Sequence, residues 1–239
     1  MRFDDSYSPS VRQHVTLLTI ARTSTNACYR FAPPFLAIIA RGFDVSIAQM
    51  GIALTVAELT GLASPLIGHR VDAMTRRRAL RLGLFGVALG TLITASAPHL
   101  AVFTLGIIVL AASKVAFDVA LGAWVADHVP WNRRSKVVGY TETSWALGLL
   151  LGVTTMGLIT AVTNWRVAYA TGAIAVLILG LIVSNRLPVA DDVIHEHNDD
   201  LEMHLEHGVL RRGSWYAIAS CFFMYSAFLI YFGLRPERL

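Results

Sequence analysis

Charged residues are scarce in this sequence. They make up 15% of its 239 residues, whereas a soluble domain carries about 25%. Cysteine is also rare, and both cysteines, Cys28 and Cys221, lie inside apolar stretches, which excludes a disulfide framework and indicates small apolar side chains. Apolar residues, in contrast, make up 55% of the chain and gather into long runs. The composition therefore predicts a protein that resides in a lipid bilayer.

Sequence motifs of soluble enzymes are also lacking. The chain has no phosphate-binding loop, no dinucleotide-binding glycine fingerprint and no paired-histidine zinc helix. We therefore expect no enzyme activity, no cofactor and no nucleic acid partner. The net charge of +4 reflects basic residues that gather in turns between apolar runs, where they fix membrane orientation. The polar N-terminus has no small-residue cleavage site, so we expect no removable signal peptide.

Seven apolar runs are long enough for the roughly 20 residues with which a helix crosses the hydrocarbon core. They are residues 14–40, 46–68, 79–97, 99–126, 137–162, 165–185 and 214–234. Short turns join the first six runs, which makes consecutive helices antiparallel neighbours. The sequence thus predicts an all-α, polytopic membrane protein with six plus one transmembrane helices.

The chain divides into four parts by composition. We expect a tail at residues 1–13, a six-helix bundle at 14–185, a linker at 186–213 and a seventh transmembrane helix with the C-terminal end at 214–239. The linker is polar and acidic, and it also carries His195, His197, His204 and His207. Histidine with carboxylate can bind zinc, but a solvated linker has the same composition, so we assign no metal site.

Basic residues are distributed unequally between the two ends of the predicted helices. Most of the arginine and lysine residues outside the apolar runs lie on the side of the N-terminus. The positive-inside rule therefore predicts a cytoplasmic N-terminus in a plasma or inner membrane. This orientation argues against seven-helix receptors and retinal proteins, and the seventh run also lacks a lysine for a Schiff base.

The turn between the second and third runs, residues 68–78, places one acid and three consecutive arginines between apolar segments. It resembles the motif Gly-x-Leu-Ala-Asp-Arg-x-Gly-Arg-Arg of the major facilitator superfamily. The motif is matched by Gly68, Asp72, Arg76 and Arg77 and departed from at Arg70, Ala73 and Thr75. The resemblance implies that Asp72 lies at a helix terminus, where its charge is favoured if that terminus is an N-terminus. Arginines also flank many cytoplasmic turns only to fix orientation, and this alternative stays open.

Between the fourth and fifth runs, Asp127 is followed by the basic residues Arg133 and Arg134. This stretch looks like the family's turn in which an acid closes the fourth helix before a basic run. In the family, that acid and the arginines of the earlier motif form a cytoplasmic charge network that steadies one conformation. The resemblance therefore implies that Asp127 pairs with Arg76 or Arg77. A charged turn with a purely structural role is the alternative.

The fifth run contains three glycines at short spacing, Gly148, Gly152 and Gly157. This pattern resembles the antiporter signature of drug-exporting family members, although Val153 stands where proline is expected. Close packing of helices through small residues explains the glycines equally well. Both interpretations stay open at this point.

Six ionisable residues lie at membrane depth. They are Arg22, Arg30, Glu58, Lys114, Asp118 and Glu142. An unpaired charge at the bilayer centre costs at least about 3 kcal/mol, so we expect opposite charges to pair. Arg30 and Glu58 lie at one level on consecutive helices, while Lys114 and Asp118 share a face at i, i+4. Arg22 lies close enough to the cytoplasm for its side chain to reach the interface.

Polar and aromatic neighbours accompany these charges. Asn26 continues the polar stripe of the first run, Tyr29 lies beside it, and Trp145 follows Glu142 at i+3. Pro33-Pro34 removes two backbone donors and is expected to bend the first helix above Arg30. We interpret the group as a polar cavity in which Glu142, Asp118 or Glu58 exchanges a proton. Ion pairs that only lock helices together are the alternative.

The family resemblance implies a transporter built from two related six-helix halves joined by a long cytoplasmic loop. It covers nearly all of this sequence, which corresponds to about half of such a transporter. We expect a secondary transporter that moves a small solute by alternating access, coupled to protons and with efflux favoured. Its expected partners are a small-molecule substrate, protons, lipid and a missing C-terminal half or a second copy. The alternatives are a half-size transporter that acts as a dimer and a non-transporting membrane partner.

Overall fold

The computed structural model describes residues 7–187, all of which belong to a first compact unit, Met1–Ile194. The linker beyond residue 187, with His195, His197, His204 and His207, and the part at 214–239 with the seventh helix and the C-terminal end lie outside the described residues. The predicted linker and seventh helix therefore stay predictions.

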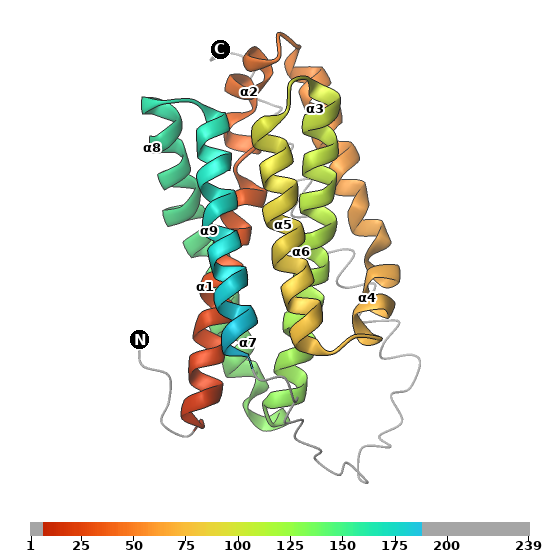
Figure 1. The fold of residues 1–239 in the computed structure, drawn as a ribbon, viewed down its shortest axis with the longest axis vertical. Coiled ribbons are helices and arrows are strands. Elements are labelled where there is room, and N and C mark those ends of the chain that lie inside the picture. Colours follow the sequence, from red (N-terminus) through yellow and green to blue (C-terminus); the bar gives the residue numbers. More distant parts are fainter. Residues whose placement is uncertain (1–6, 188–239) are drawn as a thin grey trace. The chain divides into compact units, whose positions relative to one another are not determined.

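Within residues 7–187 the chain is helical and has no strand, which confirms the all-α prediction (Figure 1). The elements are α1 (Pro9–Arg30), η1 (Pro33–Phe35), α2 (Leu36–Gly42), α3 (Ile47–Glu58), η2 (Leu59–Ala63), α4 (Ser64–Asp72), α5 (Arg76–Ser96), α6 (Leu100–His128), α7 (Trp131–Leu147), η3 (Gly148–Val153), α8 (Thr154–Val162) and α9 (Trp165–Arg186). Elements that continue one another along the chain form one rod: α1 to α2, α3 to α4, and α7 to α8. With α5, α6 and α9, the bundle has six rods, as the sequence predicts for this part of the chain.

Local capping explains where several helices begin. The Ser8 side chain accepts a hydrogen bond from the Val11 amide and Pro9 follows at the first helical position, so α1 begins earlier than the apolar run predicts. Ser46 and Gln49 form a reciprocal capping box at α3. The Asn164 side chain caps α9 by accepting from the Val167 amide at 3.0 Å. These residues satisfy amides that have no partner within the helix.

Three rods are interrupted, and in the second rod the 3-10 helix η2 separates α3 from α4. In the first, α1 ends at Arg30 and α-helix resumes at Leu36 after the proline pair, at the place where the sequence predicts a bend. In the fifth, Gly148–Val153 is a π-helix between α7 and α8. Such π segments are rare and frequently lie at functional sites.

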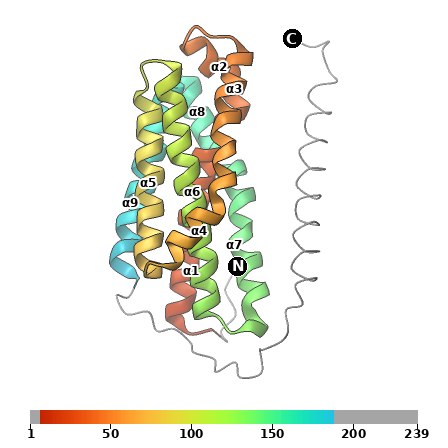
Figure 2. The ribbon, with the colours of Figure 1, turned by 90° about the vertical axis from the view of Figure 1, so that its right-hand side faces the viewer.

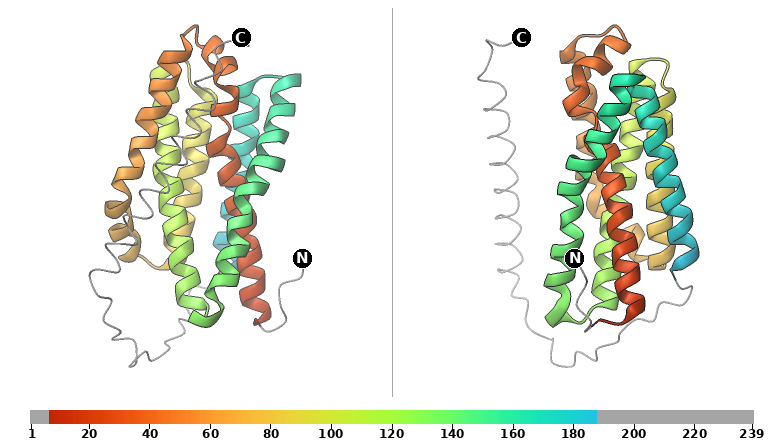
Figure 3. Two further views of the ribbon diagram at one scale, coloured as in Figure 1. Left: turned by 180° about the vertical axis from the view of Figure 1, so that it is seen from behind. Right: turned by 90° about the vertical axis from the view of Figure 1, so that its left-hand side faces the viewer.

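Five segments are long and apolar enough to cross a membrane: Ile47–Asp72, Arg76–Ser96, Leu100–His128, Trp131–Val162 and Trp165–Arg186. The first rod is more polar, and α1 packs against α6, α7, η3 and α9, lying between α7 and α9 in the right-hand view of Figure 3. Large apolar side chains point outward instead, among them Leu62 at 79% exposure and Val162 at 83%. An apolar surface around a polar interior suits a bundle in lipid.

Glycines allow α5 and α6 to lie against each other (Figures 1 and 2). A Cβ atom on Gly83 would lie 2.8 Å from the Cα atom of Phe117, and one on Gly106 would lie 2.7 Å from the Thr94 amide nitrogen. Only glycine permits this approach of two backbones. This close packing of α5 and α6 fixes the position of α6, which carries Lys114 and Asp118.

Candidate functional site

Arg22 lies at the centre of a group of ionisable side chains from three helices. Its Nε atom donates to Asp118 Oδ1 on α6 at 3.1 Å, and its Nη1 atom donates to Glu142 Oε1 on α7 at 2.6 Å. The second Asp118 oxygen accepts from Lys114 Nζ, one helical turn away. We name Arg22, Lys114, Asp118 and Glu142 the charge cluster. It joins α1, α6 and α7 through two cations and two carboxylates, so its formal charges balance.

Arg22 does not reach the membrane interface, as the sequence interpretation expected, but is 9% exposed. It lies on the buried face of α1 with Asn26, one turn further along. In this position the carboxylates of Asp118 and Glu142 on neighbouring helices stabilise the Arg22 guanidinium. If the side chain reached the interface instead, both carboxylates would lose their ion pair with Arg22. The i, i+4 spacing of Arg22 and Asn26 was the sequence signal for a shared buried face.

The two carboxylates of the charge cluster differ in exposure. The Asp118 side chain is 29% exposed and that of Glu142 is 51% exposed, whereas Lys114 is 4% exposed as a whole residue. Glu142 is therefore the member that solvent or solute can reach. Lys114 is buried and pairs with Asp118.

Arg30 does not form the expected ion pair with Glu58. Its guanidinium lies over the Trp145 ring, with Cζ 4.5 Å from the ring centroid, and 5.4 Å from that of Tyr29. Glu58 instead accepts a hydrogen bond of 2.7 Å from the Tyr29 hydroxyl. Successive residues on a helix point about 100° apart, so Tyr29 reaches the second rod while Arg30 reaches α7.

Asn26 and Ser144 add a buried polar contact between α1 and α7. Asn26 Nδ2 donates to Ser144 Oγ at 3.3 Å, and the Asn26 Oδ1 atom is buried without a hydrogen-bond partner. Sequence reasoning missed Ser144, which is fully buried and lies between Glu142 and Trp145 along the chain. The contact aligns the polar faces of the two helices.

Arg76, the first residue of α5, forms the predicted ion pair with Asp127. Its Nε atom lies 2.6 Å from Asp127 Oδ2, and Nη1 lies 3.4 Å from Asp72 Oδ1. Asp72 is the last residue of α4, so it lies at a C-terminus, where the helix dipole does not favour a carboxylate. Its ion pair with Arg76 provides the stabilisation instead. Arg77 donates to the Ser184 carbonyl near the end of α9.

Arg133 and Arg134 lie in the first turn of α7, because this helix begins at Trp131 and shortens the predicted turn. Arg134 donates to the carbonyls of Val129 and Ala126 at 2.8 and 2.6 Å, which caps the end of α6. Arg133 lies over the Tyr7 ring, with Cζ 5.6 Å from the centroid. These arginines therefore hold the α6–α7 turn together.

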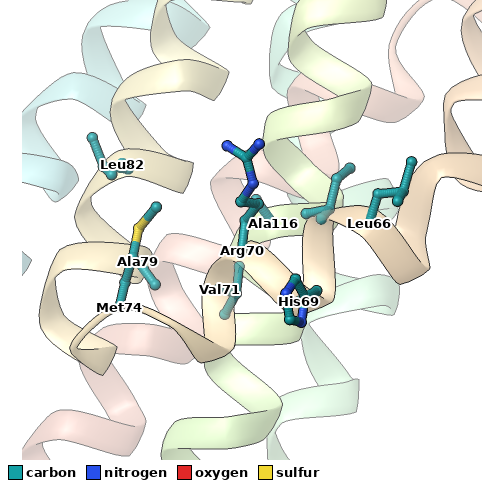
Figure 4. Close-up of a pocket in the computed structure, with 9 residues that line it drawn as sticks. Leu66, His69, Arg70, Val71, Met74, Ala79, Leu82 and Ala116 are labelled. Carbon is teal, nitrogen blue, oxygen red and sulfur yellow. The ribbon is translucent and has the colours of Figure 1, made fainter.

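A groove lies beside the Arg76 ion pairs, between α4, α5 and α6 (Figure 4). Its volume is about 540 Å³ and its walls are mainly apolar, with Leu66, Val71 and Leu82 among them. The Arg70 side chain extends along it, away from the α4–α5 turn (Figure 4). A Cβ atom on Gly68 would meet nothing within 4 Å, so packing does not require glycine there. The groove is separate from the charge cluster.

The glycines of the fifth rod pack against the first rod. A Cβ atom on Gly148 would lie 2.8 Å from Asn26 Cβ, and one on Gly157 would lie 2.7 Å from Phe35 Cζ. Close packing accounts for both positions. In the part of the chain that the structure describes, no three side chains of the metal-binding types come together.

Comparison with known proteins identifies the family. The model of the Major Facilitator Superfamily matches residues 18–237. The protein named Uncharacterized transporter YgaY, from Escherichia coli O157:H7, is 30% identical over 184 residues, which cover 76% of this chain and 46% of YgaY. Multidrug resistance protein 2 of Bacillus subtilis is 29% identical over 121 residues, which cover 50% of this chain and 29% of that protein. The chain thus spans less than half the length of these relatives.

Solved structures share the fold. The inward-facing, unoccupied structure of a bacterial homologue of the human lysosomal transporter Spinster superposes with a TM-score of 0.65 at 15% identity, covering 77% of this chain and 44% of that one. Together with the match over residues 18–237, this shows that the chain is a multi-pass membrane protein that belongs to the major facilitator superfamily.

Proposed function

We propose that this protein is a secondary transporter that moves a small solute by alternating access, coupled to protons. The observation that carries the proposal is the charge cluster, in which Arg22 joins Asp118 and Glu142 across three helices. Charges at membrane depth are expensive, and in this family's architecture they surround the solute pathway. Glu142 is the proton-exchanging group, because half of its side chain is exposed.

Protonation acts as the switch in this mechanism. A proton on Glu142 removes the negative charge that faces Arg22, so the ion pair between α1 and α7 weakens. Asp118 then remains as the carboxylate shared by Arg22 and Lys114. Because the π-helix η3 follows α7 directly, the half of the fifth rod that carries Glu142 can move without the other half.

We further propose that the end of the bundle with Arg76, Arg77 and Arg134 is cytoplasmic, in the plasma or inner membrane. The ion pairs of Arg76 then close the cytoplasmic side in one conformation. Efflux is the favoured direction, in line with the similarity to Multidrug resistance protein 2 of Bacillus subtilis. A second bundle supplies the other wall of the cavity, either as a C-terminal half or as a second copy.

Proton-driven flux in membrane vesicles tests the proposal. Cells produce the protein with and without a second six-helix half, and a pH-sensitive dye follows proton movement when anionic, neutral or cationic aromatic solutes are added. The Glu142→Gln variant should lose proton-coupled flux of every solute that the native protein moves. Asp44→Asn is the matched control, because Asp44 is exposed and its φ of 55° suits asparagine.

Two results would contradict the proposal. Flux in the Glu142→Gln variant equal to that of the native protein would remove Glu142 from the mechanism. A native protein that moves no solute with either partner arrangement would favour a non-transporting role. Cross-linking of the chain to itself separates a dimer from a protein completed by a different half.

A further inference from the structure

Within residues 7–187, Arg30 is the cation at membrane depth that forms no ion pair. Among the residues that the structure describes, Arg22 pairs with two carboxylates and Lys114 pairs with Asp118, but no acidic oxygen lies within 4 Å of Arg30. Its Nε atom is buried and has no hydrogen-bond partner. An unpaired charge at this depth costs at least about 3 kcal/mol. The site is therefore incomplete without an anion.

A second cation, Lys114, lies near the same aromatic ring as Arg30. The Lys114 Nζ atom lies 5.9 Å from the centroid of Trp145, and the Arg30 Cζ atom lies 4.5 Å from the same ring. With Arg22, three cations face the carboxylates Asp118, Glu142 and Glu58, the last of which accepts from the Tyr29 hydroxyl. The formal charges balance, but none of these carboxylates pairs with Arg30, so its guanidinium is the charge beside Trp145 that attracts an anion.

Access to Arg30 is open, whereas Lys114 is buried. Arg30 is only partly buried and is the last residue of α1, directly before the proline break. It lies about 12 Å further along the helix axis than Arg22, at 1.5 Å per residue. A solute can thus reach Arg30 without breaking the ion pairs of the charge cluster.

We propose that Arg30 binds the carboxylate of an anionic aromatic solute, and that this class is the substrate of the transporter. The proposal rests on the proposed transport function. A guanidinium presents its two Nη atoms as paired donors, which a carboxylate accepts in a bidentate arrangement. In Arg30 the buried atom without a partner is Nε, so the Nη atoms form the side of the guanidinium that a solute can reach. Tyr29 and Trp145 provide the aromatic surfaces beside it, which pack against the ring of the solute.

Binding of a matched pair of probes tests the proposal on the native protein. Naphthalene-2-carboxylate and naphthalene-2-carboxamide have nearly the same shape, but only the first is charged. Each is titrated into the purified protein in detergent. A charge-assisted bidentate contact should favour the carboxylate on the order of 10- to 100-fold in Kd. Equal affinity for the two probes would overturn the proposal.

Variants assign the preference to Arg30. Arg30→Gln should abolish it, and Arg30→Lys should retain a smaller part, because lysine keeps the charge but not the paired donors. Arg41→Gln is the control, since Arg41 is exposed on α2 and donates only to the Ala37 carbonyl. An undiminished carboxylate preference in a folded Arg30→Gln variant would place the anion elsewhere.

The two proposals fail separately. If the protein prefers the carboxylate probe but its solute flux does not depend on pH, the anion site is supported and proton coupling is refuted. Proton-coupled flux of the amide or of a cationic probe, without carboxylate preference, would leave the transporter and show that another segment supplies the counter-charge of Arg30.

Discussion

Replacing Asp118 by asparagine should destabilise the bundle more than any surface substitution. Asp118 is shared by Arg22 and Lys114, so Asp118→Asn leaves two buried cations facing Glu142 alone. Removing one partner of a buried ion pair costs about 3 to 5 kcal/mol. Because the Asp118 side chain is 29% exposed, we expect the lower end of this range, about 3 kcal/mol.

The assay is reversible unfolding in mixed detergent micelles, followed by circular dichroism. Asp72→Asn is the matched control, because the Asp72 side chain is 68% exposed and its ion pair should contribute less than about 1 kcal/mol. The double variant Lys114→Met with Asp118→Asn should recover part of the loss, since one cation and one carboxylate then remain. If Asp118→Asn unfolds like the control, or if adding Lys114→Met lowers stability further, the charge cluster does not behave as an electrostatic unit.

Two further predictions concern packing and orientation. Gly83→Ala should lower the free energy of unfolding by about 1 to 3 kcal/mol, because its Cβ atom would lie 2.8 Å from the Cα atom of Phe117. Gly122→Ala is the control, because a Cβ atom there meets nothing within 4 Å. In the same unfolding assay it should be neutral or stabilising by up to about 1 kcal/mol. Thr163 and Asn132 are both exposed and lie at opposite ends of the fifth rod. In a cysteine-free background, an impermeant maleimide should therefore label Thr163→Cys in intact cells and Asn132→Cys only after permeabilisation. The reverse labelling pattern would show the opposite orientation.

The spans could be predicted from sequence because apolar runs have lengths that the bilayer dictates. Helix ends were less accurate where polar residues continue a helix beyond the membrane. The fifth helix begins at Trp131, six residues before its apolar run, because Arg133 and Arg134 are good helix formers that also cap α6. Hydropathy reports lipid contact and not backbone conformation.

The candidate site was predicted in its members but not in all of its pairs. Sequence spacing assigns Lys114 and Asp118 to one helical face, and the structure brings them together. It does not determine which neighbouring helix a side chain faces, so Arg30 was paired with Glu58 and Arg22 was placed at the interface. Helix rotation and packing decide these contacts, and they depend on glycines such as Gly148 that set the distance between rods.

The π-helix η3 has a mechanical consequence for the fifth rod. Each π turn carries one residue more than the α-helical register would hold, and that surplus residue is stored in Gly148–Val153. Deleting one of its leucines would let the segment close as ordinary α-helix. Trp145 and Glu142 would then swivel by about 100° relative to α8, since each residue advances the helix by that angle. The surplus residue in Gly148–Val153 therefore sets the rotation of the ionisable face of α7 relative to α8.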